Sequence, residues 1–200
     1  MTTRFLLVRH ATCALTDYVL LGRSLDPPLD ARGRAQARAL ARQLRGETPA
    51  RIESSPRKRT RQTAHTIAAA MRRELHIAPE LDELDFGAWS GRSFADLDGD
   101  PDWRSWNRER GSAHTPSGVT IAGVQAALTD YLAGLAQAHP DASVLLVTHA
   151  EAIRALLMQA LHAPLDHWAL YPVPPASITR MAWNDGALVA ASAPREAAAA

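Results

Sequence analysis

The run FLLVRH at residues 5–10 is an apolar stretch that ends in an arginine and a histidine. Continuous aliphatic residues bounded by polar ones are typical of a strand buried on both faces of a parallel sheet. Ligands of such sheets bind just outside the carboxyl ends of the strands. The run therefore predicts a central strand that brings Arg9 and His10 to a binding edge. A lone Arg-His pair also fits a capping arginine beside a partly buried histidine, so a second such strand is needed.

The run SVLLVTH at residues 143–149 repeats this design near the other end of the chain. Beyond it, apolar residues recur at helical spacing from Ile153 to Leu161, which indicates a strand followed by a helix. If both strands belong to one parallel sheet, His10 and His149 project from the same edge. Further elements of an α/β domain are expected as helices at 30–44 and 121–135 and as a hairpin formed by 178–183 and 187–191.

Between these strands lies the basic stretch SSPRKRTRQTA at residues 54–64. Proline is favoured in the first turn of a helix and serine before it, so we expect a helix from Pro56 with Ser55 as its N-cap. A helix N-terminus attracts anions through its free N–H groups and its macrodipole. The stretch therefore predicts a phosphate site, to which we assign Arg59. The basic residues expected on a solvated face are Arg57, Lys58 and Arg61.

A fourth motif, LDELDFGAWSG, follows at residues 81–91. Taken in order, the four motifs resemble those of the histidine phosphatase superfamily, the phosphoglycerate mutase-like proteins. Residues 9–11 match the family's Arg-His-Gly signature, residues 54–64 its Ser-Ser-Pro block, and residues 148–150 its Ser-His-Gly element. The resemblance runs from about Arg4 to about Trp183. It implies a three-layer α/β/α sandwich around a mostly parallel central sheet.

The catalytic set implied by the resemblance is His10, Arg9, Arg59, Glu83 and His149. A neutral imidazole can attack phosphorus, and the positive charge of two nearby arginines favours the neutral form. The same guanidiniums can hold phosphate oxygens through bidentate hydrogen bonds. We therefore expect His10 to be the nucleophile and His149 to donate to the phosphoryl oxygens in the transition state.

Glu83 is the expected general acid and base. The leaving alkoxide must be protonated, and a water must later be deprotonated to break the phosphohistidine, so one carboxyl can serve both steps. Asp82 and Asp85 are close competitors. Only the match to the family's Leu-x-Glu pattern singles out Glu83.

Several positions depart from the family pattern. Alanine replaces glycine after both histidines, Thr16 stands where an asparagine of the family touches phosphate, and Val119 replaces a glutamate on the leaving-group side. We expect the hydroxyl of Thr12 or Thr16 and the backbone N–H of Gly22 to contact the anion. The residues assigned to substrate binding are Thr16, Gly22, Arg23 and Ala150.

The length of 200 residues suits one domain with a sizeable core. We place this domain at residues 1–195 and a disordered tail at 196–200. The segment 94–118, rich in Trp, Arg, Asp, Gly and Pro, is expected to be a variable cap over the pocket. Its candidate substrate contacts are Trp103, Trp106, Arg108 or Arg110, and the favoured alternative for most of them is a packing or solvated role.

The net charge of +1 provides no field that would attract nucleic acid. No run is long and apolar enough to span a membrane. The single cysteine, Cys13, and the lack of a signal-peptide pattern favour the cytoplasm. The remaining histidines lack metal-ligand spacing, so we expect no metal and no cofactor. The sequence leaves a homodimer open.

The expected activity is that of a phosphatase of the histidine acid phosphatase type. Its partner would be a small-molecule phosphate ester, hydrolysed without a metal through a phosphohistidine on His10. Two alternatives remain, namely a phosphoglycerate mutase of the same family and a non-catalytic phosphate-binding protein of the same fold. An anion binder does not need Glu83, and the family's mutases are usually longer than this chain, so hydrolysis is favoured. A cysteine phosphatase is disfavoured because no arginine follows Cys13 until Arg23.

Overall fold

A computed structural model describes residues 1–196 of the protein, and residues 197–200 of the expected tail lie outside this part. The strands are β1 (Thr2–Arg9), β2 (Arg51–Ser54), β3 (His76–Ile77), β4 (Ser143–Thr148), β5 (Ser177–Asn184) and β6 (Ala187–Glu196). The α-helices are α1 (Ala31–Gln43), α2 (Lys58–Met71), α3 (Phe94–Asp98), α4 (Pro101–Arg108), α5 (Ile121–Ala138) and α6 (Ala150–Ala160). Short 3-10 helices cover Pro79–Leu81, Gly87–Trp89 and Leu165–Leu170.

The strands form one sheet in the order β3-β2-β4-β1-β5-β6. Strands β1 to β4 run parallel to one another, whereas β5 and β6 form an antiparallel hairpin beside β1. The register of β1 and β4 pairs Arg9 with Thr148, and the N–H of His10 donates to the Thr148 carbonyl at 3.0 Å. His10 and His149 therefore leave the sheet at the same edge, as the sequence predicted.

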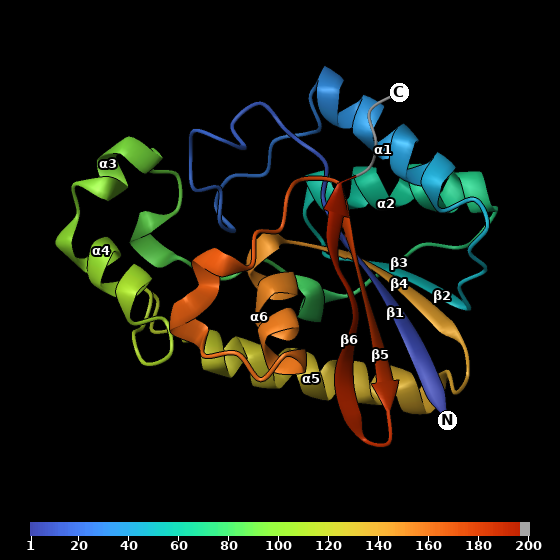
Figure 1. Ribbon diagram of the computed structural model, residues 1–200. Helices are drawn as coiled ribbons and strands as arrows, with labels where there is room; N and C mark the ends of the chain where they lie inside the picture. The colour runs from blue at the N-terminus through green and yellow to red at the C-terminus, as the bar shows by residue number, and fades with distance from the viewer. Residues whose placement is uncertain (197–200) are drawn as a thin grey trace.

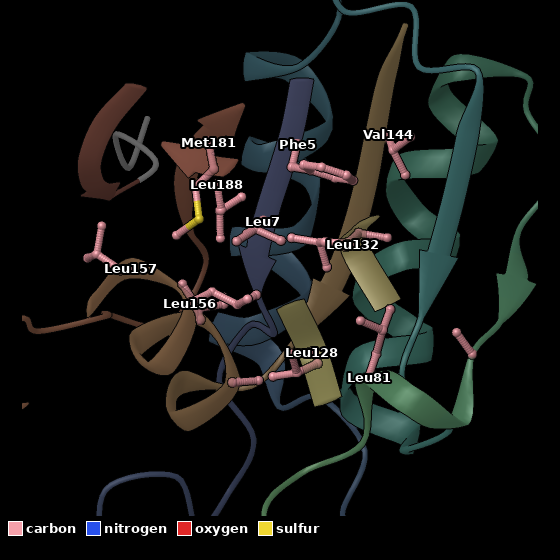
Figure 2. Packing of buried hydrophobic residues seen from close by; sticks show 14 of the residues in the cluster. Phe5, Leu7, Leu81, Leu128, Leu132, Val144, Leu156, Leu157, Met181 and Leu188 are labelled. Carbon is pink, nitrogen blue, oxygen red and sulfur yellow. The ribbon is translucent and has the colours of Figure 1, made fainter. Parts of the chain in front are cut away.

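Helices cover both faces of the sheet (Figure 1). Phe5 and Leu7 of β1 pack into the core beneath α5 and α6 (Figure 2), and Leu6 and Val8 pack into the core beneath α1 and α2. Because both sets of side chains are buried, the strand carries no polar alternation. The predicted three-layer α/β/α sandwich with a mostly parallel sheet is confirmed.

The two helices on one face begin in different ways. Helix α1 follows Asp30, whose carboxylate accepts a hydrogen bond from the Gly33 N–H at 2.6 Å. Helix α2 begins at Lys58 with Arg57 as its N-cap and without a side-chain cap. The predicted start at Pro56 with a Ser55 cap is therefore wrong. The Ser55 hydroxyl lies 2.8 Å from the His149 ring and serves that contact instead.

The segment 94–118 carries α3 and α4, which lie to one side of the sheet (Figure 1). Its interior is an aromatic cluster around Trp106, which is 1% exposed. The Trp106 ring lies 5.3 to 5.8 Å, centroid to centroid, from those of Phe86, Trp89 and Trp103. Trp106 was a candidate substrate contact, but its burial makes it a packing residue.

Candidate active site

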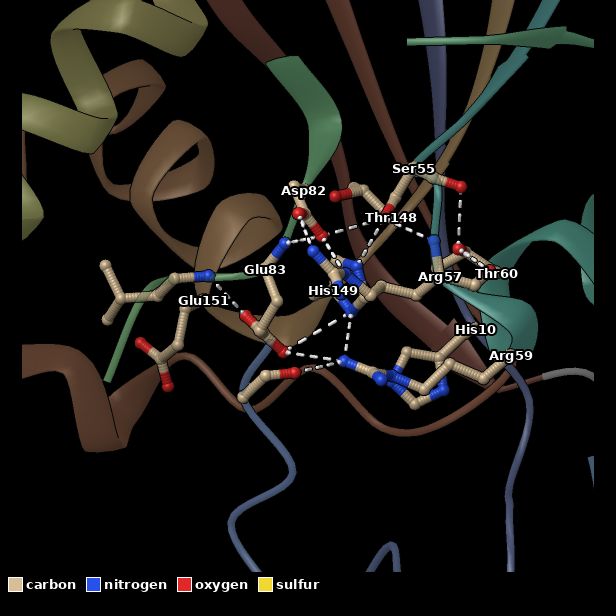
Figure 3. Close-up of polar contacts among 12 residues, drawn as sticks. His10, Ser55, Arg57, Arg59, Thr60, Asp82, Glu83, Thr148, His149 and Glu151 are labelled. Carbon is tan, nitrogen blue, oxygen red and sulfur yellow. Dashed lines mark hydrogen bonds and ion pairs between the residues drawn. The ribbon is translucent and has the colours of Figure 1, made fainter. Parts of the chain in front are cut away.

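The carboxyl edge of the sheet opens into a cavity of about 670 Å³. Arg9, His10, Arg59 and Glu83 line one end of it, and α4 of the cap lines the other. His149 is fully buried behind this floor, with its ring centroid 5.4 Å from that of His10. The structure therefore brings together all five side chains of the predicted catalytic set, of which Figure 3 labels His10, Arg59, Glu83 and His149.

His10 is held as a neutral imidazole with one free nitrogen. Its Nδ1 lies 2.8 Å from the Ala11 carbonyl oxygen, and because a carbonyl only accepts, Nδ1 carries the proton. No hydrogen bond to a described residue engages Nε2. Burial, together with the charges of Arg9 and Arg59, holds the pKa of His10 well below its usual range. The lone pair of Nε2 is therefore available for attack.

Arg9 and Arg59 are fixed guanidiniums with bonding capacity to spare. Arg9 donates from Nη1 to the Val173 carbonyl at 2.6 Å, and Arg59 donates from Nη2 to the Gly22 carbonyl at 3.0 Å. The Nε atoms of both arginines are buried without a hydrogen-bond partner among the described residues. A buried, unpaired donor is costly, so the described residues do not fully satisfy these two guanidiniums.

Glu83 follows the 3-10 helix Pro79–Leu81 and lines the cavity. Its Oε2 is 3.3 Å from His149 Nδ1 and 3.8 Å from Arg59 Nη2, and its Oε1 accepts from the Leu84 N–H at 3.0 Å. Burial raises the pKa of Glu83 to about 7 in spite of the opposing charge of Arg59. A carboxyl with this pKa can give up and take back a proton near neutral pH.

His149 is held between Ser55 and Glu83. Its Nε2 lies 2.8 Å from the Ser55 hydroxyl, and its Nδ1 faces Glu83 and the Arg59 guanidinium. Burial first, and then the charge of Arg59, holds the pKa of His149 well below its usual range. A Ser55 hydroxyl that donates to Nε2 leaves the proton on Nδ1, which is the nitrogen directed toward the floor of the cavity.

Arg57 and Asp82 buttress this arrangement, a role that the sequence did not indicate. The Arg57 guanidinium forms a two-point ion pair with the Asp82 carboxylate, one of its bonds being Nε to Oδ1 at 2.7 Å. Although burial opposes it, this pairing lowers the pKa of Asp82. Asp82 also accepts from the Glu83 N–H at 2.8 Å and so fixes the backbone beside that residue. Arg57 is therefore not part of a solvated face, and Asp82 is committed to Arg57.

The residues assigned to substrate binding divide into two groups. Thr16, Gly22 and Ala150 line the cavity. The Thr16 hydroxyl is engaged with the Cys13 backbone, at 2.9 Å to its carbonyl and 2.8 Å to its N–H. Arg23 lies outside the lining and donates from Nε to the Glu83 carbonyl at 2.6 Å, so the structure places it as a support of the Glu83 loop.

Other acidic and hydroxyl candidates have local partners. The Thr12 hydroxyl donates to the Asp30 carboxylate at 3.0 Å. Asp85, a competitor of Glu83, accepts from the Gly87 N–H at 3.0 Å. Neither lines the cavity, which leaves Glu83 as the carboxyl beside the two histidines.

A second buried cluster joins the cap to α6. The Glu151 carboxylate accepts from Arg110 Nη1 at 2.6 Å and is also paired with Arg154. Burial opposes ionisation, but these two arginines lower the pKa of Glu151 to about 2. The Arg110 guanidinium is stacked between the Trp106 and Trp168 rings, 4.0 and 3.8 Å from their centroids. No sequence motif indicated this cluster.

Two features are absent from residues 1–196. That part of the chain holds no group of three or more His, Cys, Asp or Glu residues arranged to bind a metal ion. None of its helices combines the length and the hydropathy needed to cross a bilayer.

A family model, described as the histidine phosphatase superfamily (branch 1), matches residues 5–193. Phosphoserine phosphatase 1 of Hydrogenobacter thermophilus is 32% identical over 165 residues, covering 82% of this chain and 78% of that protein. Glucosyl-3-phosphoglycerate phosphatase of Mycobacterium tuberculosis is 30% identical over 92% of this chain and 87% of its own. Against other mycobacterial proteins, which are 33% identical, the chain spans 45% of their length.

Solved structures agree with these matches. Phosphoserine phosphatase of Entamoeba histolytica, in complex with 3-phosphoglyceric acid, aligns with a TM-score of 0.86 at 25% identity, covering 96% of this chain and 97% of that one. The family model spans nearly the whole chain, and the motifs that first suggested the family converge on one cavity. The chain therefore belongs to the histidine phosphatase superfamily.

Proposed function

We propose that the protein is a phosphatase that hydrolyses a small phosphate monoester through a phosphohistidine on His10, without a metal ion. Membership of the family and the similarity to phosphoserine phosphatase 1 and glucosyl-3-phosphoglycerate phosphatase support the phosphatase activity. The observation that carries the mechanism is the free Nε2 of a neutral His10 between the buried guanidiniums of Arg9 and Arg59.

In the first step, His10 Nε2 attacks phosphorus while the bond from phosphorus to the ester oxygen breaks. Arg9 and Arg59 hold the non-bridging oxygens, and His149 adds a donor as negative charge redistributes. A well-placed donor of this kind contributes roughly 3 kcal/mol. Glu83 in its protonated form gives its proton to the leaving alkoxide, which departs as an alcohol.

In the second step, the Glu83 carboxylate takes a proton from water, and the resulting nucleophile attacks phosphorus. The bond from phosphorus to His10 breaks, inorganic phosphate leaves, and both His10 and Glu83 return to their starting protonation states. A pKa of about 7 for Glu83 suits a group that must be an acid in one step and a base in the next.

The proposed independence of metal rests on charge. Two guanidiniums already face the phosphate site, and they supply the positive charge and the directed donors that a metal would otherwise provide.

Phosphate release from p-nitrophenyl phosphate in the presence of EDTA tests the proposal. We expect activity in the wild type and none in His10→Ala, and mass spectrometry should find a phosphorylated peptide that contains His10. His65→Ala is the matched control because His65 is an exposed histidine on α2, and it should retain full activity. Activity that survives His10→Ala, or that EDTA abolishes, would contradict the mechanism.

A phosphoglycerate mutase is the second candidate, since a probable phosphoglycerate mutase of Proteus mirabilis is 34% identical over 79% of this chain. The same phosphohistidine would then return its phosphoryl group to a substrate hydroxyl instead of water. Incubation with 3-phosphoglycerate distinguishes the two. A phosphatase releases inorganic phosphate, whereas a mutase yields the isomer with phosphate conserved.

A further inference from the structure

The cavity extends well beyond the catalytic set. Its volume of about 670 Å³ falls within the range of roughly 300–1,000 Å³ found for pockets that enclose ligands of drug size. Apolar side chains also line it, namely Val19, Leu20, Leu21, Phe86, Phe94 and Trp103. A substrate that fills this space has an extended and partly apolar body between the phosphate site and α4.

Two arginines line the far end of the cavity. Arg104 and Arg108 lie one turn apart on α4, and both are exposed. Arg104 donates from Nη1 to the Asp98 carbonyl at 3.1 Å. Among the described residues, no carboxylate lies within ion-pair distance of either guanidinium, and Arg108 forms no side-chain hydrogen bond. Asp98 is the acidic residue that lines this end, so two positive charges face one negative charge.

Two other arginines that line the cavity differ from Arg104 and Arg108 because they have a carboxylate partner. Arg110 and Arg154 also line the cavity, but both are paired with Glu151. Glu151 offsets one of their two charges and is bonded to both guanidiniums. The cavity-lining arginines of the cap without a carboxylate partner among the described residues are therefore Arg104 and Arg108.

This pair is unfavourable for the helix on its own. Like charges at i and i+4 destabilise a helix, although the C-terminal position of Arg108 offsets part of this through the helix dipole. An anion placed between the two guanidiniums would turn the repulsion into two attractive contacts. Guanidiniums bind carboxylates and phosphates with directed hydrogen bonds.

We propose that Arg104 and Arg108 form a subsite for a second anionic group of the substrate. The substrate class is then an extended phosphomonoester with a carboxylate or a second phosphate at the end remote from the ester that is hydrolysed. This inference rests on the proposed phosphatase activity and adds to it the chemistry of the other end of the substrate.

Matched esters test the subsite. The probes are n-hexyl phosphate, ω-phosphooxyhexanoate and hexanediol bisphosphate, which share one body and differ only in the remote group. We expect kcat/KM to be about fivefold higher for the esters with a remote anion, as an exposed charge pair would give, and the preference should decline with added salt. The ratio between the carboxylate and bisphosphate esters identifies which anion the subsite prefers.

Variants locate the preference on α4. In the double variant Arg104→Gln/Arg108→Gln, the ratio of kcat/KM between the remote-anion esters and hexyl phosphate should fall to about 1, because the attraction is removed. Arg61→Gln is the matched control, since Arg61 is an exposed arginine on α2 that does not line this cavity, and it should keep the wild-type ratio. Circular dichroism checks that each variant is folded.

The outcomes distinguish failure of the proposed subsite from failure of the proposed phosphatase activity. Equal kcat/KM for all three esters in the wild type, or a preference that survives in the double variant, would overturn the subsite and leave the phosphatase activity intact. Absence of phosphate release from every ester and from p-nitrophenyl phosphate would instead overturn the proposed function.

Discussion

On the floor of the cavity, polar side chains are held by partners from several elements, whereas two arginines of the cap have no carboxylate partner among the described residues. Ser55 and Glu83 hold His149 from two sides, and every one of these groups is buried or nearly so. In the cap, Arg104 and Arg108 are exposed and lack an acidic partner among the described residues. The difference suits a site in which the chemistry needs fixed geometry and the recognition of the substrate is left to the cap.

Among variants that keep His10, the largest loss of activity should follow removal of the acid on the cavity floor. Glu83→Gln should lower kcat/KM for n-hexyl phosphate about 10²–10⁴-fold, because the alkoxide then leaves without a proton. With p-nitrophenyl phosphate, whose leaving group is stable as an anion, formation of the phosphoenzyme should be less affected than its hydrolysis. Rapid-mixing assays should then show a burst of p-nitrophenol and accumulation of the phosphoenzyme.

Glu80→Gln is the control for this variant, because Glu80 is an exposed carboxylate three residues earlier. It should leave both substrates unaffected. A Glu83→Gln enzyme that hydrolyses both esters at the wild-type rate would remove Glu83 from the mechanism.

Truncation of a side chain in the aromatic cluster of the cap should lower the stability of the protein. Trp106→Ala removes a side chain that is 1% exposed and stacked under Arg110, and we expect the free energy of unfolding to fall by about 3–5 kcal/mol. Tyr18→Ala, at a position that is 72% exposed, should change it by less than about 0.5 kcal/mol. Urea titrations measure both. Equal effects would show that the aromatic cluster does not hold the cap.

The parts of this molecule that the sequence predicts are those with local signals. The apolar runs of β1 and β4 predicted buried strands because no polar residue interrupts them. The apolar spacing within 30–44 predicted α1, and the structure adds that the Asp30 carboxylate caps a free N–H at its start. The order of the motifs, together with the parallel register, was enough to bring His10 and His149 to one edge.

The parts that sequence could not predict depend on distant contacts. The sequence placed Ser55 as a helix cap because its local context suits one. In the structure, the Ser55 hydroxyl instead contacts the ring of His149, which lies 94 residues away in the chain. Arg57 looked like a solvated cation until the loop that carries Asp82 supplied its partner. The pairing of Arg110 with Glu151 joins residues 41 positions apart, and no local sequence pattern around either residue predicts the pairing.

The pH dependence of kcat/KM should report the ionisation of Glu83 on the cavity floor. Because Glu83 has a pKa of about 7 and must be protonated in the first step, kcat/KM for n-hexyl phosphate should fall about tenfold per pH unit above that value. His10 stays neutral well below this range because its pKa is depressed, so the rate should be level on the acid side near neutrality. In Glu83→Gln the alkaline limb should disappear. A limb that persists in that variant would belong to another group.

A smaller effect on the rate is expected for a residue that touches no substrate. Ser55→Ala removes the 2.8 Å contact to His149 Nε2 and leaves that nitrogen buried without a partner. We expect kcat to fall about tenfold, which corresponds to a loss of about 1.4 kcal/mol of transition-state stabilisation. KM should hardly change, because Arg9 and Arg59 remain to bind the phosphate.

Two matched variants show whether this effect comes from positioning the ring or from a general loss of stability. Ser54→Ala removes an equally buried hydroxyl, but that hydroxyl donates to the Ser55 carbonyl at 2.8 Å and does not contact the imidazole. It should lower the melting temperature without lowering kcat, and Ser55→Thr, which keeps the hydroxyl, should restore most of the rate. Nitrogen NMR of the histidine ring should show the proton of His149 on Nδ1 in the wild type and a mixture of tautomers in Ser55→Ala. If Ser54→Ala and Ser55→Ala lower kcat equally, Ser55 acts through stability and does not position His149.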